Sequence, residues 1–395
     1  MLFAKLNDLS IGGKGAYGIA ASAVERKADL PTYLRITDIF DDGTLNLSEL
    51  KSVDAPNSDK YLLKPNDIVF ARTGGSTGRN YFYDGSDGVF VYAGFLIKFS
   101  IDPEKVNPKY VKYYCRSKQY NDWVQSFNTG STRGNINAQT FGNMEIPLPE
   151  RKQQDYLVSI LEPIDEKIKN NKQVNDNLEQ QAQSYFQELF VDNADPEWTT
   201  GTISDLGTVV GGSTPSKAKP EYYTESGIAW ITPKDLSNNK SKFVSHGEND
   251  ITELGLRNSS ASIMPEGTVL FSSRAPIGYI AIAAGEVTTN QGFKSVVPKP
   301  EIGTPFVYFF LKNTLPVIEG MASGSTFKEV SGSTMKNVPA VIPDAETLAK
   351  FSDFCAPIFA QQRILEEQNQ SLATLRDNLL PKLMSGEIEV SAVQL

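Results

Sequence analysis

The 395-residue sequence contains few of the side chains that build metal centres or disulfide frameworks. Its two cysteines, Cys115 and Cys355, are too few for a disulfide scaffold or a zinc site. His246 is the single histidine, so a histidine-based metal centre is not expected. No apolar run approaches the roughly 20 residues of a membrane-spanning helix, and the first residues lack the pattern of a signal peptide. These absences predict a cytoplasmic chain without membrane spans and without a bound metal.

An excess of basic residues, which is common in nucleic-acid-binding chains, is also missing, because the net charge is −9. The acidity is unevenly distributed along the chain. Residues 1–149 and 195–343 carry net charges of +1 and −2, whereas 150–194 and 344–395 carry −4 each. The two larger segments can therefore each present a local basic surface. The composition weakens a nucleic-acid-binding hypothesis without excluding it.

Three motifs that suggest catalysis are better explained by local structure. Asn107-Pro108-Lys109-Tyr110 resembles the tetrapeptide of amino-methyltransferases, but a lysine replaces its second proline and no glycine-rich cofactor loop precedes it. Asparagine followed by proline instead predicts the start of a helix. GGSTPSK at 211–217 lacks the glycine directly before the lysine of a phosphate loop, and Asp41-Asp42 lies in a turn sequence. Without a nucleophile–base arrangement, the sequence does not indicate an enzyme.

The segment from Glu150 to Phe190 carries a stripe of apolar and amide residues spaced alternately four and three apart, the pattern of a coiled-coil seam. The pattern recurs 194 residues later without a gap, so the chain supplies its own partner helix. Asn171, Asn175 and Asn369 are polar seam residues that we expect to fix the register of the pairing. The residues expected to pair the helices are Leu157, Leu161, Ile164, Ile168, Asn175, Leu178, Tyr185 and Leu189, with Ile358, Leu365, Asn369, Leu372, Leu379 and Leu383.

The two larger segments also repeat each other. Residues 63–78 predict a turn, a strand and a Gly/Ser/Thr loop, and 263–278 match them at a shift of 200. Residues 88–100 predict a strand pair or a bent strand, and a helix is expected from Asn107 toward Trp123 and Phe127. The matched residues are Pro65 with Pro265, Val69 with Val269, Gly78 with Gly278, and Gly94-Phe95 with Gly292-Phe293. The pattern predicts an α+β protein made of a duplicated unit: domains 1–149 and 195–343, and helices 150–194 and 344–395.

Loops at matching places in both halves carry the donors that duplex DNA requires. Glycines allow the backbone to approach phosphates, hydroxyls hydrogen-bond to them, and arginine or lysine can recognise guanine edges. The candidates in the first half are Lys14, Tyr17, Arg72, Thr73, Ser76, Arg79, Ser131, Thr132 and Arg133. Those in the second half are Ser216, Lys217, Lys234, Arg274, Ser325, Thr326 and Lys328, together with Ser213, Lys219, Lys240 and Lys242.

The closing run NQSLATLRDNLLPKLMSGEIEV (369–390) resembles the C-terminal signature of the specificity subunits of type I restriction–modification enzymes. PNDIVFARTGG (65–75) and IPLPERKQQDYLVSILEPIDEKI (146–168) are also similar to that family. The second helix entry, 341–351, departs from it by lacking the usual Glu-Gln or Gln-Gln pair. The resemblance covers essentially the whole chain in the family's order of recognition domain, helix, recognition domain, helix.

The resemblance implies a pseudo-two-fold molecule in which the helices form an antiparallel coiled coil and each domain recognises half of a split site in double-stranded DNA. It further implies two adenine methyltransferase subunits docked on the helices, with motor-nuclease subunits joining the complex. S-adenosylmethionine, ATP and Mg²⁺ are then expected on those partners and none on this chain.

Three alternatives remain open from the residues alone. The chain could be a coiled-coil scaffold whose domains bind proteins, or a methyltransferase with its own target domain, which the missing cofactor loop argues against. It could also be the specificity subunit of a related methyltransferase-only or type II-like system.

Overall fold

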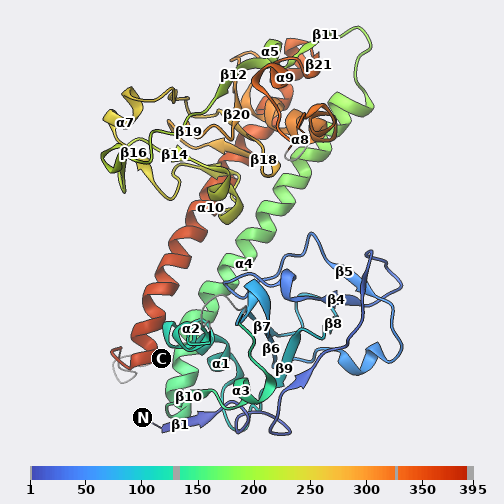
Figure 1. The fold of residues 1–395 in the computed structure, drawn as a ribbon. Helices are drawn as coiled ribbons and strands as arrows, with labels where there is room; N and C mark the ends of the chain where they lie inside the picture. The colour runs from blue at the N-terminus through green and yellow to red at the C-terminus, as the bar shows by residue number, and fades with distance from the viewer. Residues whose placement is uncertain (1, 128–133, 325–327, 389–395) are drawn as a thin grey trace. The chain divides into compact units, whose positions relative to one another are not determined.

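The computed structural model describes residues 2–127, 134–324 and 328–388. It divides into two compact units, which we call unit 1 (Met1–Lys167 with Leu372–Leu395) and unit 2 (Ile168–Ser371). Two long helices, α4 (Arg151–Gln187) and α10 (Ala345–Ser385), each contribute to both units (Figure 1). Among the described residues, no helix is both long and apolar enough to span a membrane.

Unit 1 is built from short strands followed by short helices. Its strands are β1 (Leu2–Lys5), β2 (Ala16–Tyr17), β3 (Ala23–Val24), β4 (Thr32–Leu34), β5 (Lys51–Val53), β6 (Asp67–Ala71), β7 (Asn80–Tyr83), β8 (Phe90–Tyr92), β9 (Leu96–Ser100) and β10 (Glu145–Leu148). Its helices are α1 (Pro108–Tyr114), α2 (Lys118–Gln125) and α3 (Ala138–Gly142), followed by the first part of α4.

Unit 2 begins within α4, which ends in a π-turn at Glu188–Asp192. Its strands are β11 (Thr199–Thr202), β12 (Gly207–Gly211), β13 (Tyr223–Thr224), β14 (Trp230–Ile231), β15 (Phe243–Val244), β16 (Asp250–Ile251), β17 (Val269–Ser273), β18 (Ile277–Ala283), β19 (Thr288–Thr289), β20 (Lys294–Pro298) and β21 (Pro339–Ile342). Its helices are α5 (Ile203–Leu206), α6 (Pro233–Asn238), α7 (Glu253–Arg257), α8 (Thr304–Met321) and α9 (Gly332–Lys336), before α10.

The strand order confirms the predicted duplication. The main sheet of unit 1 has the order β2-β9-β6-β7, and that of unit 2 has the order β12-β20-β17-β18, with β15 added at its edge. Each unit also closes its ends with an antiparallel pair, β1 with β10 and β11 with β21. A parallel pair recurs as well, β4 with β8 in unit 1 and β14 with β19 in unit 2. The two units therefore share the order of four main-sheet strands and these two additional pairs.

Strand β6 is central to unit 1 because it is covered on both faces. Ile68 and Phe70 point into a core formed with α1, α2, α3 and the long helices, whereas Val69 and Ala71 point into a second core beneath β4 and β8. All five residues of β6 are buried, as expected of a strand with two covered faces. Strand β17 has the same arrangement in unit 2, with Phe271 on one face and Leu270 on the other.

Backbone hydrogen bonds correct the sequence alignment of the two halves by one residue. The amide of Asn66 bonds to Tyr83 O at 3.0 Å, and its counterpart Gly267 bonds to Ala283 O at 2.9 Å. The strands β6 and β17 are thus offset by 201 residues, so pairing Pro65 with Pro265 and Val69 with Val269 was wrong by one position. The offset returns to 200 at Gly78 and Gly278, because the loop after β6 is one residue longer than the loop after β17.

The same comparison corrects the match of Phe95 with Phe293. Ala71 pairs with Leu96 in unit 1, and Ser272 pairs with Phe293 in unit 2, so Phe293 corresponds to Leu96. A shift of one residue moves a side chain to the other face of a strand. This explains why Phe293 is fully buried whereas Phe95 is 57% exposed.

Two expectations for residues 88–125 need refinement. Residues 88–100 do form a strand pair, but β8 and β9 belong to different sheets. The segment from Asn107 toward Phe127, expected to be one helix, forms two helices, α1 and α2. Ser117 lies between them and caps α2, since its side chain accepts a hydrogen bond from the Tyr120 amide. The predicted start is confirmed, since the Asn107 side chain accepts from the Lys109 amide at 3.0 Å and Pro108 is the first helical residue.

Candidate nucleic-acid interface

In unit 1, Arg72 lies over the ring of Tyr17, with 5.2 Å between its guanidinium carbon and the ring centroid. Arg72 directly follows β6, and its backbone is held on both sides by Phe95 O at 3.1 Å and the Ile136 amide at 2.9 Å. The Tyr17 hydroxyl accepts a hydrogen bond from the Ala138 amide at 3.1 Å. The structure thus brings together two candidates, Arg72 and Tyr17, that are 55 positions apart in the sequence.

Arg79 lies in the same glycine-rich loop region, but each of its three guanidinium nitrogens donates a hydrogen bond within unit 1. It donates to both carboxylate oxygens of Asp41 at 2.6 and 3.0 Å and to Ile39 O at 3.1 Å. The carboxylate of Asp41 in the acidic turn therefore has a structural role as the partner of Arg79. Thr73 and Ser76 are half-buried in the loop after β6. Contact of Arg79 with DNA stays a prediction that requires it to leave Asp41.

Lys14 is exposed in the loop before β2, where its ammonium is accessible to a phosphate. Five other predicted contacts lie outside the described residues: Ser131, Thr132, Arg133, Ser325 and Thr326.

In unit 2, Ser216 and Lys217 are exposed in the loop that follows β12. The segment GGSTPSK begins where this strand ends, at Gly211. Lys234, in α6, forms an exposed ion pair with Glu248 at 2.6 Å. Lys328 is exposed as well. Surface ion pairs of this kind are weak and readily exchanged, so Lys234 keeps its charge available.

Arg274 follows β17 and faces the carboxylate of Glu329, with 3.5 Å between the charged atoms. The ammonium of Lys294 lies 3.9 Å from the same carboxylate. Burial lowers the pKa of Lys294, and Glu329 partly offsets that effect. Glu329 thus lies between two cations at the place where the strand β17 ends.

Lys242 was among the basic residues expected to contact DNA, and the structure shows this expectation to be wrong. Its ammonium is buried in unit 2, pairs with Glu179 and donates to Gln362 Oε1 at 2.6 Å. It also lies 3.9 Å from the centroid of the Phe359 ring. Burial lowers the pKa of Lys242, while Glu179 partly offsets the shift. Its role is to attach the segment before β15 to the long helices. Of its neighbours, Lys240 lies over Tyr279, at 4.4 Å from the ring centroid.

Unit 2 has different residues at the backbone positions that correspond to Arg72 and Tyr17. Ser273 has the hydrogen bonds that Arg72 has in unit 1, because its amide bonds to Gly292 O at 2.7 Å and its carbonyl accepts from Val330 at 2.9 Å. Tyr17 pairs with Ile97 across the sheet edge, and Gly211 occupies the matching position opposite Lys294. Serine and glycine thus replace arginine and tyrosine on the same framework.

The predicted pairing of the long helices is observed within each unit. In unit 2, Asn171 bonds to Gln368 and Asn369, and Asn175 bonds to Gln362 O, so rising numbers on α4 meet falling numbers on α10. The two helices are therefore antiparallel. The predicted pairing residues of both segments are all buried or half-buried.

Beside the seam lies a set of charged residues that the sequence pattern did not predict. Asp165 lies within 3.1 Å of Lys112, Arg116 and Arg376, all in unit 1. Burial favours a higher pKa for Asp165, but these three cations outweigh it and hold the pKa well below its usual range. In unit 2, the Glu179 carboxylate likewise forms ion pairs with Lys242 and Lys312. The available signal was their position next to the seam residues Ile164 and Leu178, where charges commonly flank a coiled coil.

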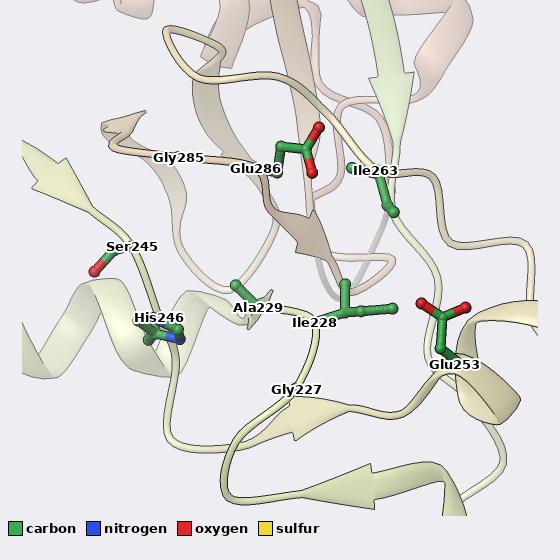
Figure 2. Close-up of a pocket in the computed structure, with 9 residues that line it drawn as sticks. All are labelled: Gly227, Ile228, Ala229, Ser245, His246, Glu253, Ile263, Gly285 and Glu286. Carbon is green, nitrogen blue, oxygen red and sulfur yellow. The ribbon is translucent and has the colours of Figure 1, made fainter.

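Unit 2 also contains a pocket of about 400 Å³ lined by both polar and apolar groups. Figure 2 shows the side chains of Glu253 and Glu286 on either side of it, with Ile228 and Ile263 between. His246 lines one side, and its Nδ1 lies 3.4 Å from the buried Asp250. Two carboxylates disfavour a phosphate here, so this pocket is not part of the candidate DNA-binding surface.

A duplicated framework with different polar loops is typical of a protein that binds two related targets. Within the described ranges, no group of three or more His, Cys, Asp or Glu side chains is placed to hold a metal ion.

The family model described as the type I restriction modification DNA specificity domain matches residues 25–180 and, a second time, residues 196–375. The chain belongs to this family, whose members are non-catalytic DNA-recognition subunits. The two matches fall on the two halves of the duplication.

Individual relatives agree with this assignment. The chain is 39% identical over 191 residues to the type I restriction enzyme MjaIX specificity subunit of Methanocaldococcus jannaschii, a match that covers 46% of this chain and 44% of that protein. It is 23% identical over an alignment of 450 residues to the type I restriction enzyme HindI specificity subunit of Haemophilus influenzae, covering 92% and 97% of the two chains. The fold is similar to the crystal structure of the type I restriction–modification S subunit from M. genitalium, with 18% identity, a TM-score of 0.58 and 97% and 95% coverage.

Proposed function

We propose that this chain gives a type I restriction–modification complex its DNA sequence specificity, each unit recognising one half of a bipartite duplex site. The observation that carries the proposal is the conserved strand order of the two units with different side chains at the same backbone place, Arg72 and Tyr17 against Ser273 and Gly211. A shared framework positions both loops, while the different side chains allow each unit to prefer a different base sequence.

We further propose that the long helices dock two adenine methyltransferase subunits, and that motor-nuclease subunits join this complex. S-adenosylmethionine, ATP and Mg²⁺ would act on those partners rather than on this chain. Support comes from Val174 on α4 and Ile364 on α10, which are 44% and 57% exposed although the neighbouring Asn171 and Leu365 are buried. Exposed apolar side chains on such helices favour contact with another protein.

The test uses the full chain assembled with its methyltransferase subunits. Mapping the methylated adenines in genomic DNA should reveal a motif of two short specified sequences separated by an unspecified gap. Replacing Lys217 and Arg274 with alanine should alter the half recognised by unit 2 and leave the other half unchanged. Methylation without sequence preference, or a complex that does not bind duplex DNA, would overturn the proposed function.

A second assay addresses docking. Val174→Asp together with Ile364→Asp should reduce assembly with the methyltransferase subunit, measured by analytical ultracentrifugation, since two carboxylates cannot be buried there without cost. The exposed Asn170→Asp serves as the matched control on α4. Unimpaired assembly of the double variant would exclude this face of the helices as the docking surface and would support the scaffold alternative only if DNA binding were also absent.

A further inference from the structure

Arg72 differs from the other described arginines of unit 1 because its guanidinium has no hydrogen-bond acceptor among the described residues. Within the described part of this unit, its side chain forms no ion pair and no hydrogen bond, and its Nε atom is buried without a partner. The remaining described arginines of unit 1 each have an oxygen partner: Arg26 with Ser52, Arg35 with Asp38, Arg79 with Asp41, Arg116 and Arg376 with Asp165, and Arg151 with Asp155. A half-buried donor without an acceptor is costly to maintain, and the described residues leave the terminal N–H groups of Arg72 open to a ligand.

The guanidinium is also held in a fixed position. Two backbone hydrogen bonds, to Phe95 O and from the Ile136 amide, fix the Arg72 backbone at the end of β6. The Tyr17 ring supports the guanidinium, and the hydroxyl of Tyr17 is in turn anchored by the Ala138 amide. Because the side chain is ordered before a ligand binds, less conformational entropy is lost when its hydrogen bonds form.

A planar guanidinium presents parallel N–H groups that match two acceptors on one edge. In the major groove of duplex DNA, guanine offers O6 and N7 in that arrangement, whereas adenine offers N7 beside a donor. A phosphate also accepts two such bonds but occurs at every position of the backbone. Fixed orientation therefore favours recognition of guanine, while an exposed and mobile lysine such as Lys14 is better suited to phosphate contact.

We propose that Arg72, supported by Tyr17, is the specificity-determining residue of unit 1 and that it recognises a guanine of the first half-site. This proposal rests on the proposed function and names one base contact within it. Unit 2 has Ser273 and Gly211 at the corresponding places, and its nearby Arg274 and Lys294 already face Glu329. The base contact assigned to Arg72 thus belongs to one half-site only.

The experiment measures binding of the complete methyltransferase complex to a panel of duplexes, each with one base pair of the wild-type motif replaced. The chain carries Arg72→Ala, Arg72→Lys, Tyr17→Ala or Tyr17→Phe. We expect R72A to weaken binding of the intact site by about 10- to 100-fold and to remove the preference at one G·C pair of the first half-site. R72K should keep the charge but not the preference, because an ammonium lacks the planar pair of donors. Tyr17→Ala should weaken the same preference more than Tyr17→Phe, which retains the ring.

Arg26→Ala is the control, since Arg26 is an arginine of unit 1 outside the predicted DNA contacts and donates to Ser52 Oγ at 3.2 Å. It should leave every base preference unchanged. The base preferences at the second half-site should be the same in every variant, which shows that each variant is folded and assembled. A purely structural role for Arg72 would lower the unfolding midpoint of R72A without changing a base preference.

Three results would overturn the proposal. The first is a uniform loss in R72A with a salt slope reduced by about one, which would identify a phosphate contact. The second is that R72A keeps every base preference of the wild type. The third is a preference lost in Arg26→Ala but kept in R72A. Each leaves the bipartite motif of the wild-type complex intact, whereas failure of the proposed function would abolish that motif in the wild type itself.

Discussion

Asn171 on α4 donates a hydrogen bond from Nδ2 to Oδ1 of Asn369 on α10, at 2.9 Å, near the residues where the helix segments of unit 2 begin and end, Ile168 and Ser371. The same amide group lies 2.7 Å from Gln368 Oε1, and Asn171 is 2% exposed. A buried amide that bonds to two residues of the opposing helix specifies one register, since any shift leaves polar groups without partners.

Asn171→Ala should therefore destabilise the chain by about 1–3 kcal/mol, because the oxygens of Gln368 and Asn369 lose a buried donor. Urea unfolding of the full chain measures the change. Asn170→Ala, at the exposed neighbouring position, is the control and should stay within about 0.5 kcal/mol of wild type. Equal stability of both variants would show that the hydrogen bonds of Asn171 contribute nothing to the pairing.

Asp165→Asn should remove most of the attraction between α4 and the cations Lys112, Arg116 and Arg376. Loss of one partner of a mostly buried ion cluster costs about 3 kcal/mol at neutral pH. The folded-state pKa of Asp165 is held below its unfolded value. The ionised carboxylate therefore contributes to folding stability above the unfolded pKa of about 4, and this contribution is lost as the pH falls toward the folded pKa.

The difference in stability between wild type and Asp165→Asn should consequently be constant near neutral pH and shrink below about pH 4. Thermal unfolding at a series of pH values tests this. Glu166→Gln, which alters the exposed adjacent carboxylate, provides the control. A difference that grows on acidification would contradict the assignment of charge pairing to Asp165.

Lys242→Met should destabilise unit 2 by about 3 kcal/mol, because Glu179 loses the buried one of its two cationic partners. At temperatures where the variant is folded, its salt slope of DNA binding should equal that of wild type, since a buried ammonium releases no counterion from DNA. Lys240→Met is the exposed control and should have a small effect on stability. A reduced salt slope in Lys242→Met would restore the DNA-contact interpretation that burial argues against.

Gly78→Ala and Gly278→Ala should each destabilise their own unit by about 2 kcal/mol or more. Both glycines have positive φ, 87° and 94°, where a Cβ is strained. The added carbon would also lie 2.4 Å from the Val124 side chain in unit 1 and 2.7 Å from that of Leu315 in unit 2.

The control for these substitutions is Gly75→Ala, where a Cβ would meet no atom within 4 Å. Val124→Ala in the Gly78→Ala background should recover part of the loss by relieving the contact but not the backbone strain. Equal urea midpoints for Gly75→Ala and Gly78→Ala would show that the turn after β6 is not constrained as described.

The repeated pattern of the sequence was sufficient to predict the duplication, the two long helices and most of their seam. Periodicity is a local property, and a stripe such as Leu157, Leu161 and Ile164 indicates the buried face of a helix whatever its partner. The cap at Asn107-Pro108 was predicted for the same reason, since the interaction that starts α1 lies within three residues of the chain.

The alignment of the two halves failed by one residue at Val69 because strand register depends on hydrogen bonds to other strands. In a uniformly apolar segment such as β6, a shift of one residue leaves an equally apolar pattern. The difference between Phe95, exposed, and Phe293, buried, follows from that register and is not visible in the matching Gly-Phe letters.

The sequence by itself determined the class of the candidate site, polar glycine-containing loops with scattered cations, but not the state of each cation. Arg72, Arg79 and Lys242 look alike in the sequence. Arg72 lies over Tyr17 without an acceptor among the described residues, whereas Arg79 is bound to Asp41 and Lys242 is buried against Glu179. Their partners come from segments between about 40 and 65 residues away in the chain, and the attraction between charges depends on their distance in space. Only the tertiary structure brings such groups together, so it alone decided which cation is available for DNA.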